Sequence, residues 1–406
     1  MAKFGLLGRT LGHSWSPQIH SVLGSSPYDL YEVEPEALEG FLRGTDADGL
    51  NVTIPYKKAV LPFCTRLSDV AKESGSVNTL VREGDGWFGT NTDFDGFLYT
   101  VRKSGVSVME KKALVFGSGG VSGTICHALK TLGAASVTVI SRSGEDNYEN
   151  LDRHADAQVL VNCTPVGMYP KVGEAVVSLD RFPRCECVFD LIYNPTKTAL
   201  LLDAEARGIP FSDGLPMLVA QAVRASELFQ IKSIPDELIR TIERTLRMQM
   251  QNIVLVGMPG CGKSTLGKLL ADALSKRFVD LDEEIVRTAG KDIETIFREE
   301  GEAGFRKRET AEIVKWGKES GLVLATGGGC VTRSENRAPL RQNGTVVWIK
   351  RAIDALPTEG RPLSKSTSLT AMYETRKPLY KDFSDLTIDN IGAPEEVLKT
   401  LLEVLK

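Results

Sequence analysis

The sequence predicts an α/β protein built from three lobes, and three observations lead to this prediction. Short apolar runs that fit strands alternate with helical patterns along all 406 residues. Two glycine-rich segments, 117–123 and 257–264, each follow such a run and precede a helical pattern, which is how nucleotide-binding α/β units begin. A chain of this length suits two or three domains of ordinary size.

Eight apolar runs fit buried strands of parallel sheets. They cover residues 3–7, 49–54, 113–116, 137–140, 188–191, 253–256, 323–325 and 346–349. Helical patterns include 265–274 and a longer one from Pro235 to about residue 250, whose acidic start suits the helix dipole. The strand at 253–256 follows that helix almost at once, so no flexible linker separates the two halves.

Composition favours small-molecule chemistry. The net charge of -4 gives no basic surface for nucleic acid or an anionic membrane. No run reaches 18 apolar residues, and the start of the chain does not read as a signal peptide. The seven scattered cysteines suit reduced thiols. We therefore predict a cytoplasmic protein without nucleic-acid or membrane partners, and leave its oligomeric state open.

The segment Gly257-x4-Gly262-Lys263-Ser264 predicts a phosphate-binding loop. It lies between a strand and a helical pattern, so backbone amides and the helix N-terminus would face the phosphates of ATP. Lys263 would reach the outer phosphates, and Ser264 could bind Mg²⁺. The predicted ATP ligands are Gly260, Cys261, Gly262, Lys263, Ser264 and Thr265.

Five weaker motifs follow this loop in order. Asp280 and Asp282 lie on one side of the end of an extended segment, where one could hold Mg²⁺ and the other accept a proton; alone, such a pair is usually a solvated turn or helix start. The later motifs are Gly301-Glu302-x2-Phe305-Arg306-x2-Glu309, Ala325-Thr326-Gly327-Gly328-Gly329, Arg361-Pro362-Leu363 and Arg376-x-Pro378-Leu379-Tyr380.

In this order the motifs resemble the shikimate kinase family across residues 252–406. The resemblance implies a P-loop domain of the nucleoside-monophosphate-kinase type that transfers the γ-phosphate of ATP to the 3-hydroxyl of shikimate. It implies Asp280 for Mg²⁺, Asp282 for substrate hydroxyls and as base, Arg306 and Arg376 for the substrate carboxylate, Gly328 for the substrate loop, and Lys263 and Arg361 for the transferring phosphoryl group. Only 14 residues separate Arg361 from Arg376, which predicts a short lid.

Three features near the start of the chain carry polar groups at strand ends. Ser14 and Ser16 could both bind one carboxylate, although the segment also reads as a helix cap followed by an early proline. Lys57 and Asp93 each end a strand-like stretch. They form an acid/base pair only if the fold brings them together.

The order of these blocks resembles the shikimate dehydrogenase family from residue 3 to about 245. Further matching blocks lie at 75–79, 162–168, 190–195 and 214–221. The resemblance implies a substrate lobe at 1–101, to which helices of 214–246 return. The implied substrate ligands are Ser14, Ser16, Thr53, Lys57, Asn78, Asp93 and Gln221. Lys57 would protonate the carbonyl oxygen of 3-dehydroshikimate as hydride arrives, and Asp93 would orient it.

Residues 102–213 read as a Rossmann lobe for a dinucleotide. The loop residues Gly117, Ser118, Gly119, Gly120 and Val121 follow a strand and precede a helix. About 20 residues on, where an NAD enzyme carries an acid, the chain has Ser141-Arg142-Ser143, which suits the 2′-phosphate of NADP. Gly214, the first residue of the block at 214–221, is the last of the predicted cofactor ligands.

Our leading hypothesis is therefore a bifunctional enzyme that reduces 3-dehydroshikimate with NADPH and then phosphorylates shikimate with ATP and Mg²⁺. One alternative is a quinate/shikimate dehydrogenase with relaxed cofactor use. Another is that one half, the kinase-like module above all, is regulatory or non-catalytic. We assign no catalytic role to His20, which we expect to be a packing or surface group.

Overall fold

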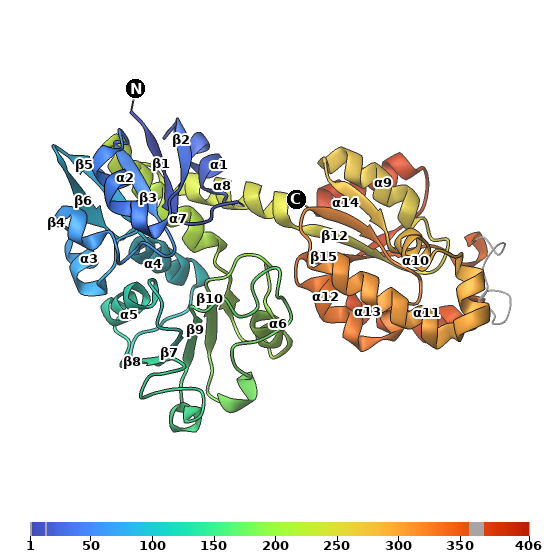
Figure 1. The fold of residues 1–406 in the computed structure, drawn as a ribbon. Coiled ribbons are helices and arrows are strands. Elements are labelled where there is room, and N and C mark those ends of the chain that lie inside the picture. Colours follow the sequence, from blue (N-terminus) through green and yellow to red (C-terminus); the bar gives the residue numbers. More distant parts are fainter. Residues whose placement is uncertain (1, 13, 357–368, 406) are drawn as a thin grey trace. The chain divides into compact units, whose positions relative to one another are not determined.

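The computed structural model describes residues 2–12, 14–356 and 369–405. The chain divides into two compact units, which we describe separately. The N-terminal unit comprises Met1–Met168, Glu174–Tyr193 and Leu200–Leu246, and the C-terminal unit comprises Tyr169–Gly173, Asn194–Ala199 and Arg247–Lys406. Figure 1 shows the helices and strands of both.

The first lobe of the N-terminal unit contains a six-stranded mixed sheet. Its elements are β1 (Phe4–Gly8), α1 (Ser16–Leu23), β2 (Tyr28–Glu32), α2 (Leu38–Gly44), β3 (Gly49–Val52), β4 (Cys64–Leu67), α3 (Asp69–Ser74), β5 (Thr79–Glu83), β6 (Gly86–Thr90) and α4 (Asp93–Ser104). The strand order is β2-β1-β3-β5-β6-β4, with β5 antiparallel to β3 and β6. The carboxyl ends of β1, β3 and β6 and the start of β5 therefore lie along one edge.

The second lobe is a parallel sheet with helices on both faces. Its elements are β7 (Lys112–Phe116), α5 (Ser122–Thr131), β8 (Ser136–Ile140), β9 (Val159–Asn162), β10 (Cys187–Asp190), α6 (Ala199–Ala206) and β11 (Phe211–Ser212), followed by α7 (Leu215–Gln230) and α8 (Asp236–Met250). The strand order is β11-β10-β9-β7-β8. Because side chains alternate along a strand, Ala113 and Val115 pack with α4 and α5, whereas Leu114 and Phe116 pack with α6.

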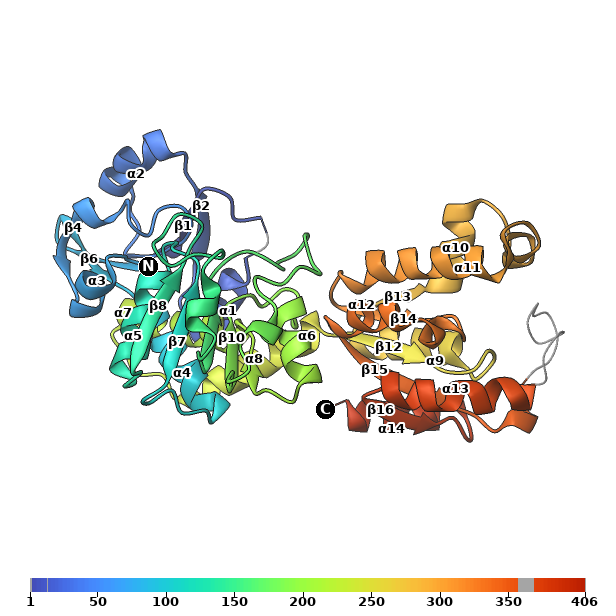
Figure 2. The same cartoon turned by 90° about the horizontal axis from the view of Figure 1, so that it is seen from below.

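The C-terminal unit is a second parallel sheet between helices. Its elements are β12 (Asn252–Val256), α9 (Lys263–Leu274), β13 (Arg277–Asp280), α10 (Leu281–Ala289), α11 (Ile293–Gly317), β14 (Leu322–Ala325), α12 (Arg337–Arg341), β15 (Gly344–Lys350), α13 (Leu369–Phe383), β16 (Leu386–Asp389) and α14 (Pro394–Val404). Figure 2 shows the strand order β13-β14-β12-β15-β16. In Figure 1, α9 and α14 lie on one face and α12 and α13 on the other.

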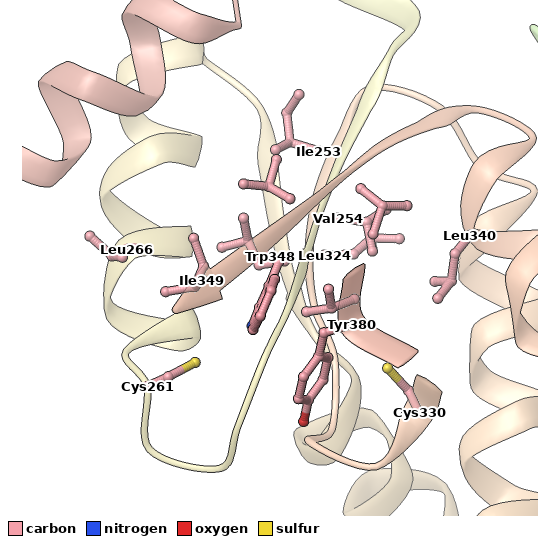
Figure 3. Packing of buried hydrophobic residues seen from close by; sticks show 14 of the residues in the cluster. Ile253, Val254, Cys261, Leu266, Leu324, Cys330, Leu340, Trp348, Ile349 and Tyr380 are labelled. Atoms are coloured by element: carbon pink, nitrogen blue, oxygen red, sulfur yellow. The ribbon is translucent and has the colours of Figure 1, made fainter. Parts of the chain in front are cut away.

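Two apolar clusters stabilise the C-terminal unit. The larger joins the central strands to the helices on both faces, and Figure 3 shows part of it around Val254, Leu324 and Trp348. A smaller cluster of Ile285, Ile296 and Phe305 joins α10 to α11. The backbone of α11 leaves helical geometry at Gly301, where φ is 66° and ψ is -176°.

The α/β class expected from the sequence is confirmed. Each of the eight predicted strands is present with ends within two residues of the prediction, and the helices predicted at 265–274 and from residue 235 are present as α9 and α8. Within the described parts of the chain, no helix is both long and apolar enough to cross a lipid bilayer.

His20 is a fully buried packing residue. Its ring stacks on Tyr28 with centroids 4.1 Å apart and lies 5.9 Å from the ring of Phe229. The Asn51 side chain is the polar group beside the ring, and neither ring nitrogen makes a well-formed hydrogen bond within the described residues. Burial lowers the pKa of His20 to about 3, because a charged imidazolium would lose its hydration there.

We predict that His20 makes the N-terminal unit sensitive to acid. The unfolded chain binds a proton at His20 near pH 6.5 and the folded chain only near pH 3, so stability is complete above pH 6.5 and falls below it. His20→Phe keeps a stacked ring without the titrating group. Between pH 6.5 and 4.5 the wild type should lose about 2 to 3 kcal/mol more unfolding free energy than the variant, measured by urea denaturation. Parallel pH profiles for the two proteins would contradict this.

Candidate active sites

The polar residues predicted for the first site lie along one edge of the six-stranded sheet. Thr53 follows β3, Asn78 precedes β5, and Asp93 follows β6. The register pairs Asn51 with Thr79 and Thr79 with Thr90, which brings these three strand ends together. The segment carrying Ser14 and Ser16 leaves the same edge after β1, which runs parallel to β3.

Lys57 and Asp93 form an ion pair at this edge. The Lys57 Nζ atom donates a hydrogen bond to Asp93 Oδ2 at 2.6 Å, and the two side chains are only 16% and 9% exposed. Asp93 is the first residue of α4, where the helix dipole stabilises a negative charge. The fold thus brings together two residues that lie 36 positions apart in the sequence.

Two buried asparagines support this pair. The Oδ1 atom of Asn78 accepts a hydrogen bond from the Thr92 backbone at 2.7 Å, so any ligand contact from Asn78 falls to its Nδ2 group. Asn91 Nδ2 donates to the Ser76 carbonyl at 3.0 Å and to Thr124 Oγ1 of α5 at 2.9 Å. The sequence analysis did not single out Asn91; its place two residues before Asp93 was the available signal.

The remaining predicted substrate ligands lie at the start of α1 and on α7. Ser14 Oγ accepts a hydrogen bond from the backbone of Ser16, which begins α1. Gln221 lies on α7, where its amide donates to the Leu218 carbonyl at 2.8 Å. Its Cβ lies 3.1 Å from the position that a Cβ on Gly96 of α4 would take, so Gln221 is held against the helix that begins with Asp93.

The glycine-rich loop after β7 reaches the Lys57–Asp93 pair. A Cβ atom on Gly120 would lie 3.5 Å from Lys57 Cβ, and one on Gly123 would lie 2.5 Å from the Ser74 carbonyl oxygen. Gly117 adopts φ 102°, which disfavours other residues. A Cβ atom on Gly119 would have open space around it, with no neighbouring group of the described residues within 4 Å. This open backbone fits the pyrophosphate of a dinucleotide.

The other predicted cofactor residues lie at the same end of the parallel sheet. The Gly117 amide donates to the carbonyl of Ile140, the last residue of β8, and Ser141, Arg142 and Ser143 follow directly. Arg142 is exposed, so its guanidinium is available to a 2′-phosphate. Gly214 lies where a Cβ would meet the Leu191 carbonyl oxygen at 2.0 Å, just beyond β10.

The C-terminal site begins with the loop between β12 and α9. Gly257 and Gly262 have φ of 148° and 99°, values that favour glycine. Lys263, the first residue of α9, is buried, and its Nζ atom donates to the carbonyls of Gly257 and Met258 at 2.9 and 3.0 Å. The ammonium therefore lies inside the curve of the loop, as phosphate binding requires.

Ser264 and Asp280 place two oxygen ligands together. Ser264 Oγ donates to Asp280 Oδ2 at 2.6 Å, while Asp280 Oδ1 accepts from the Asp282 amide at 3.0 Å and so caps α10. A hydroxyl and a carboxylate at a phosphate loop are the ligand types that suit Mg²⁺. The two predicted metal ligands thus fit that ion.

Three consecutive glycines, Gly327 to Gly329, form the loop after β14, which we call the glycine loop. Asp282, Arg306 and Glu309 lie against this loop, and we call this part the acceptor side of the site. A Cβ on Gly327 would lie 2.4 Å from Glu309 Oε1 and 2.9 Å from Asp282 Oδ1. One on Gly329 would lie 2.0 Å from the Arg306 Nη2 atom. The loop after β14 therefore lies against the carboxylates and the guanidinium, and any larger residue would displace them.

Glu309 is a site residue that the predictions missed. Its carboxylate is fully buried and accepts a hydrogen bond from Arg306 Nη1 at 2.7 Å, whereas Glu302 reaches the same guanidinium at 3.4 Å and is half exposed. Burial raises the pKa of Glu309, and the Arg306 charge opposes that rise. The i, i+3 spacing from Arg306 was the available signal.

Arg376 and Arg361 complete the predicted set. Arg376 lies on α13 and donates from Nη1 to the Gly328 carbonyl at 3.1 Å, which brings it to the glycine loop. Arg361, and with it the predicted short lid, lies outside the residues that the structure describes.

Comparisons with known proteins find the two families that the sequence motifs resemble. A family model for the shikimate dehydrogenase substrate-binding domain matches residues 6–80, and one for shikimate kinase matches residues 259–406. A shikimate dehydrogenase (NADP(+)) of Caldanaerobacter subterraneus subsp. tengcongensis is 34% identical over 253 residues, which are 56% of this chain and 90% of that protein. The chain belongs to the shikimate dehydrogenase family. It also carries a shikimate kinase domain at residues 259–406, so one chain contains matches to both families.

Two solved structures of the dehydrogenase family are similar to the N-terminal part. A chorismate mutase/shikimate 5-dehydrogenase fusion protein from Clostridium acetobutylicum is 35% identical with a TM-score of 0.57, covering 61% of this chain and 97% of that one. Shikimate 5-dehydrogenase from Thermus thermophilus, in complex with NADP(H) and shikimate, is 30% identical with a TM-score of 0.55, covering 60% and 99%. The expected fold of this family is confirmed.

We predict that Glu309 stabilises the C-terminal unit through Arg306. Glu309→Ala leaves a buried guanidinium without its closest carboxylate and should lower the unfolding free energy by about 3 kcal/mol. Glu302→Ala is the matched control: it also removes a partner of Arg306, but an exposed one, and should cost less than about 1 kcal/mol. Unfolding by guanidinium chloride, followed by tryptophan fluorescence, measures the unfolding free energy of both variants. Equal losses of unfolding free energy in the two variants would contradict the assignment.

Proposed function

We propose that this chain is a bifunctional enzyme that reduces 3-dehydroshikimate to shikimate with NADPH and then phosphorylates shikimate with ATP. In this proposal residues 1–101, with the returning helices of 214–246, form the substrate lobe. Residues 102–213 bind NADP(H), and residues 252–406 form the kinase domain. Both reactions act on the same oxygen, the one at C3 of the ring.

The observation that carries the dehydrogenase half is the Lys57–Asp93 pair beside Gly120 of the cofactor loop. The carbonyl oxygen of 3-dehydroshikimate gains negative charge during reduction, and the Lys57 ammonium can stabilise that charge and donate the proton. Asp93 holds the ammonium in place. A positioned acid of this kind contributes about 10²- to 10⁴-fold in rate.

The cofactor proposal rests on the loop and on Arg142. NADPH supplies the hydride when bound. The backbone at 117–121 would hold its pyrophosphate and Arg142, with Ser141 and Ser143, its 2′-phosphate, because a guanidinium binds phosphate by charge-assisted hydrogen bonds. Gly214 lies just beyond β10, where the absence of a side chain lets its backbone pack against the Leu191 carbonyl, and we assign it to the same cofactor site.

The main support for the kinase activity is that Asp282 and Arg306 both lie against the glycine loop. Arg306, and Arg376 beside Gly328, would bind the carboxylate of shikimate and so direct its 3-hydroxyl toward Asp282. Asp282 can accept the hydroxyl proton as the phosphoryl group leaves ATP. Lys263 and Arg361 would stabilise the charge on that group, and Ser264 and Asp280 would hold Mg²⁺, which neutralises the phosphates when bound.

Two further assignments belong to the proposal. A pocket beside the phosphate loop is lined by Ser264, Thr265, Lys268, Leu269, Pro394 and Glu395, and we assign it to the nucleoside part of ATP. We also propose a cytoplasmic enzyme, which the free state of its seven cysteines supports. The net charge of -4 favours the absence of nucleic-acid or membrane partners.

We predict that the two activities can be removed one at a time. Lys57→Ala should abolish NADPH oxidation with 3-dehydroshikimate but leave phosphorylation of added shikimate, because only the proton donor is lost. Lys263→Ala should do the reverse. Steady-state rates of NADPH consumption and ADP release measure both reactions on each protein. The two-site proposal fails if either variant loses both activities or neither.

We also predict that Arg142 selects NADP over NAD. Arg142→Ala should raise the KM for NADPH about 10- to 100-fold, since a hydrogen bond between charged groups is lost, and leave the KM for NADH unchanged. Arg153→Ala removes an exposed arginine elsewhere in the same lobe and is the control. An equal effect of Arg142→Ala on both cofactors would contradict the assignment.

The alternatives from the sequence have distinct outcomes in the same assays. A quinate/shikimate dehydrogenase with relaxed cofactor use would oxidise quinate with NAD at a rate comparable to that for shikimate with NADP. A regulatory kinase-like module would bind shikimate or ATP without releasing ADP. We expect neither result from the wild-type protein.

A further inference from the structure

Tyr380 carries a polar group into the core of the C-terminal unit. Its side chain is fully buried, and its ring stacks on Trp348 with centroids 5.7 Å apart. Figure 3 shows the ring between Cys261 and Cys330, with the hydroxyl at the end nearest the loops. Burial raises the pKa of Tyr380, so the hydroxyl keeps its proton and acts as a donor.

That donor binds the backbone of the glycine loop. The Tyr380 hydroxyl donates to the Gly328 carbonyl at 2.5 Å, and Arg376 Nη1 donates to the same oxygen at 3.1 Å. Arg376 and Tyr380 lie four residues apart on α13, so they face the same way. One carbonyl thus accepts two hydrogen bonds from adjacent turns of one helix.

The position of this carbonyl oxygen fixes the direction of the next amide N–H in the loop. The peptide that joins Gly328 to Gly329 is planar, and in a trans peptide the amide N–H points away from the carbonyl oxygen. Holding the oxygen toward Tyr380 therefore directs the Gly329 N–H to the opposite side. Rotation of this peptide would break both hydrogen bonds.

The peptide also lies between two parts of the proposed kinase site. A Cβ on Gly328 would be 2.5 Å from Pro259 Cδ of the phosphate loop, and one on Gly329 would be 2.0 Å from Arg306 Nη2. The Tyr380 hydroxyl lies 3.8 Å from Met258 Sδ, also in the phosphate loop. A shift of the peptide would thus move the acceptor side of the site relative to the ATP side.

We propose that Tyr380 is a positioning residue for the acceptor substrate. Its hydroxyl fixes the Gly328–Gly329 peptide, and the Gly328 carbonyl in turn orients Arg376, which would bind the substrate carboxylate. Tyr380 acts through this loop and does not touch the substrate. The inference rests on the proposed kinase function.

The test is Tyr380→Phe in the full chain, which removes one oxygen atom and keeps the packed ring. We expect the KM for shikimate to rise about tenfold, the loss expected for one buried hydrogen bond, while kcat and the KM for ATP stay within about twofold. ADP release is measured with added shikimate and no NADP. Tyr373→Phe is the control on the same helix, where the ring lies beside Lys377, and it should leave all three constants unchanged.

Two results would overturn the inference while the kinase proposal stands. One is an unchanged KM for shikimate in Tyr380→Phe. The other is a fall in kcat with a rise in both KM values and a lower unfolding temperature, which is the signature of a merely structural role. A wild-type protein that releases no ADP when shikimate is added is a separate outcome, which would overturn the kinase proposal and this inference with it.

Discussion

Both candidate sites depend on backbone that carries no side chain where another group must come close. At Gly329 the space that a Cβ would fill belongs to the Arg306 guanidinium, and at Gly123 it belongs to the Ser74 carbonyl of the neighbouring lobe. Gly329 lies in the loop after β14 and Gly123 at the start of α5, and in each case a polar group from a distant segment occupies the place of a side chain. The parallel sheets supply this arrangement repeatedly, because all their strands end at one edge.

Much of the fold could be predicted from the sequence, because buried strands and glycine-rich turns leave local signals. The contacts within the two candidate sites were harder to predict. The positions of Lys263 and Ser264 in the phosphate loop could be predicted, because both belong to one local motif. The approach of Lys57 to Gly120 could not, because it joins two lobes and leaves no local signal in the sequence. Glu309 was visible as part of a motif, but its burial against Arg306 depends on where the glycine loop lies. The functional roles of these residues stay predictions.

The two units use their ion pairs differently. The Lys57–Asp93 pair lies at a sheet edge and keeps some exposure, which suits the proton transfer to a substrate oxygen that we propose for Lys57. The Arg306–Glu309 pair is almost wholly buried, and a guanidinium does not give up its proton. Its rigid fork suits the binding of a carboxylate instead. In the proposed mechanisms, the same type of interaction would therefore serve proton transfer in one unit and substrate orientation in the other.

The small cluster of Ile285, Ile296 and Phe305 is separate from the main core of its unit, and α11, which carries the last two of these residues, is interrupted at Gly301. A segment with few buried apolar contacts opens at a lower free energy than the whole unit. The α10–α11 corner can therefore exchange its amide hydrogens while the strands beneath the phosphate loop stay closed. Opening of this corner would move Asp282 and Arg306 of the proposed kinase site without unfolding the loop that would bind ATP.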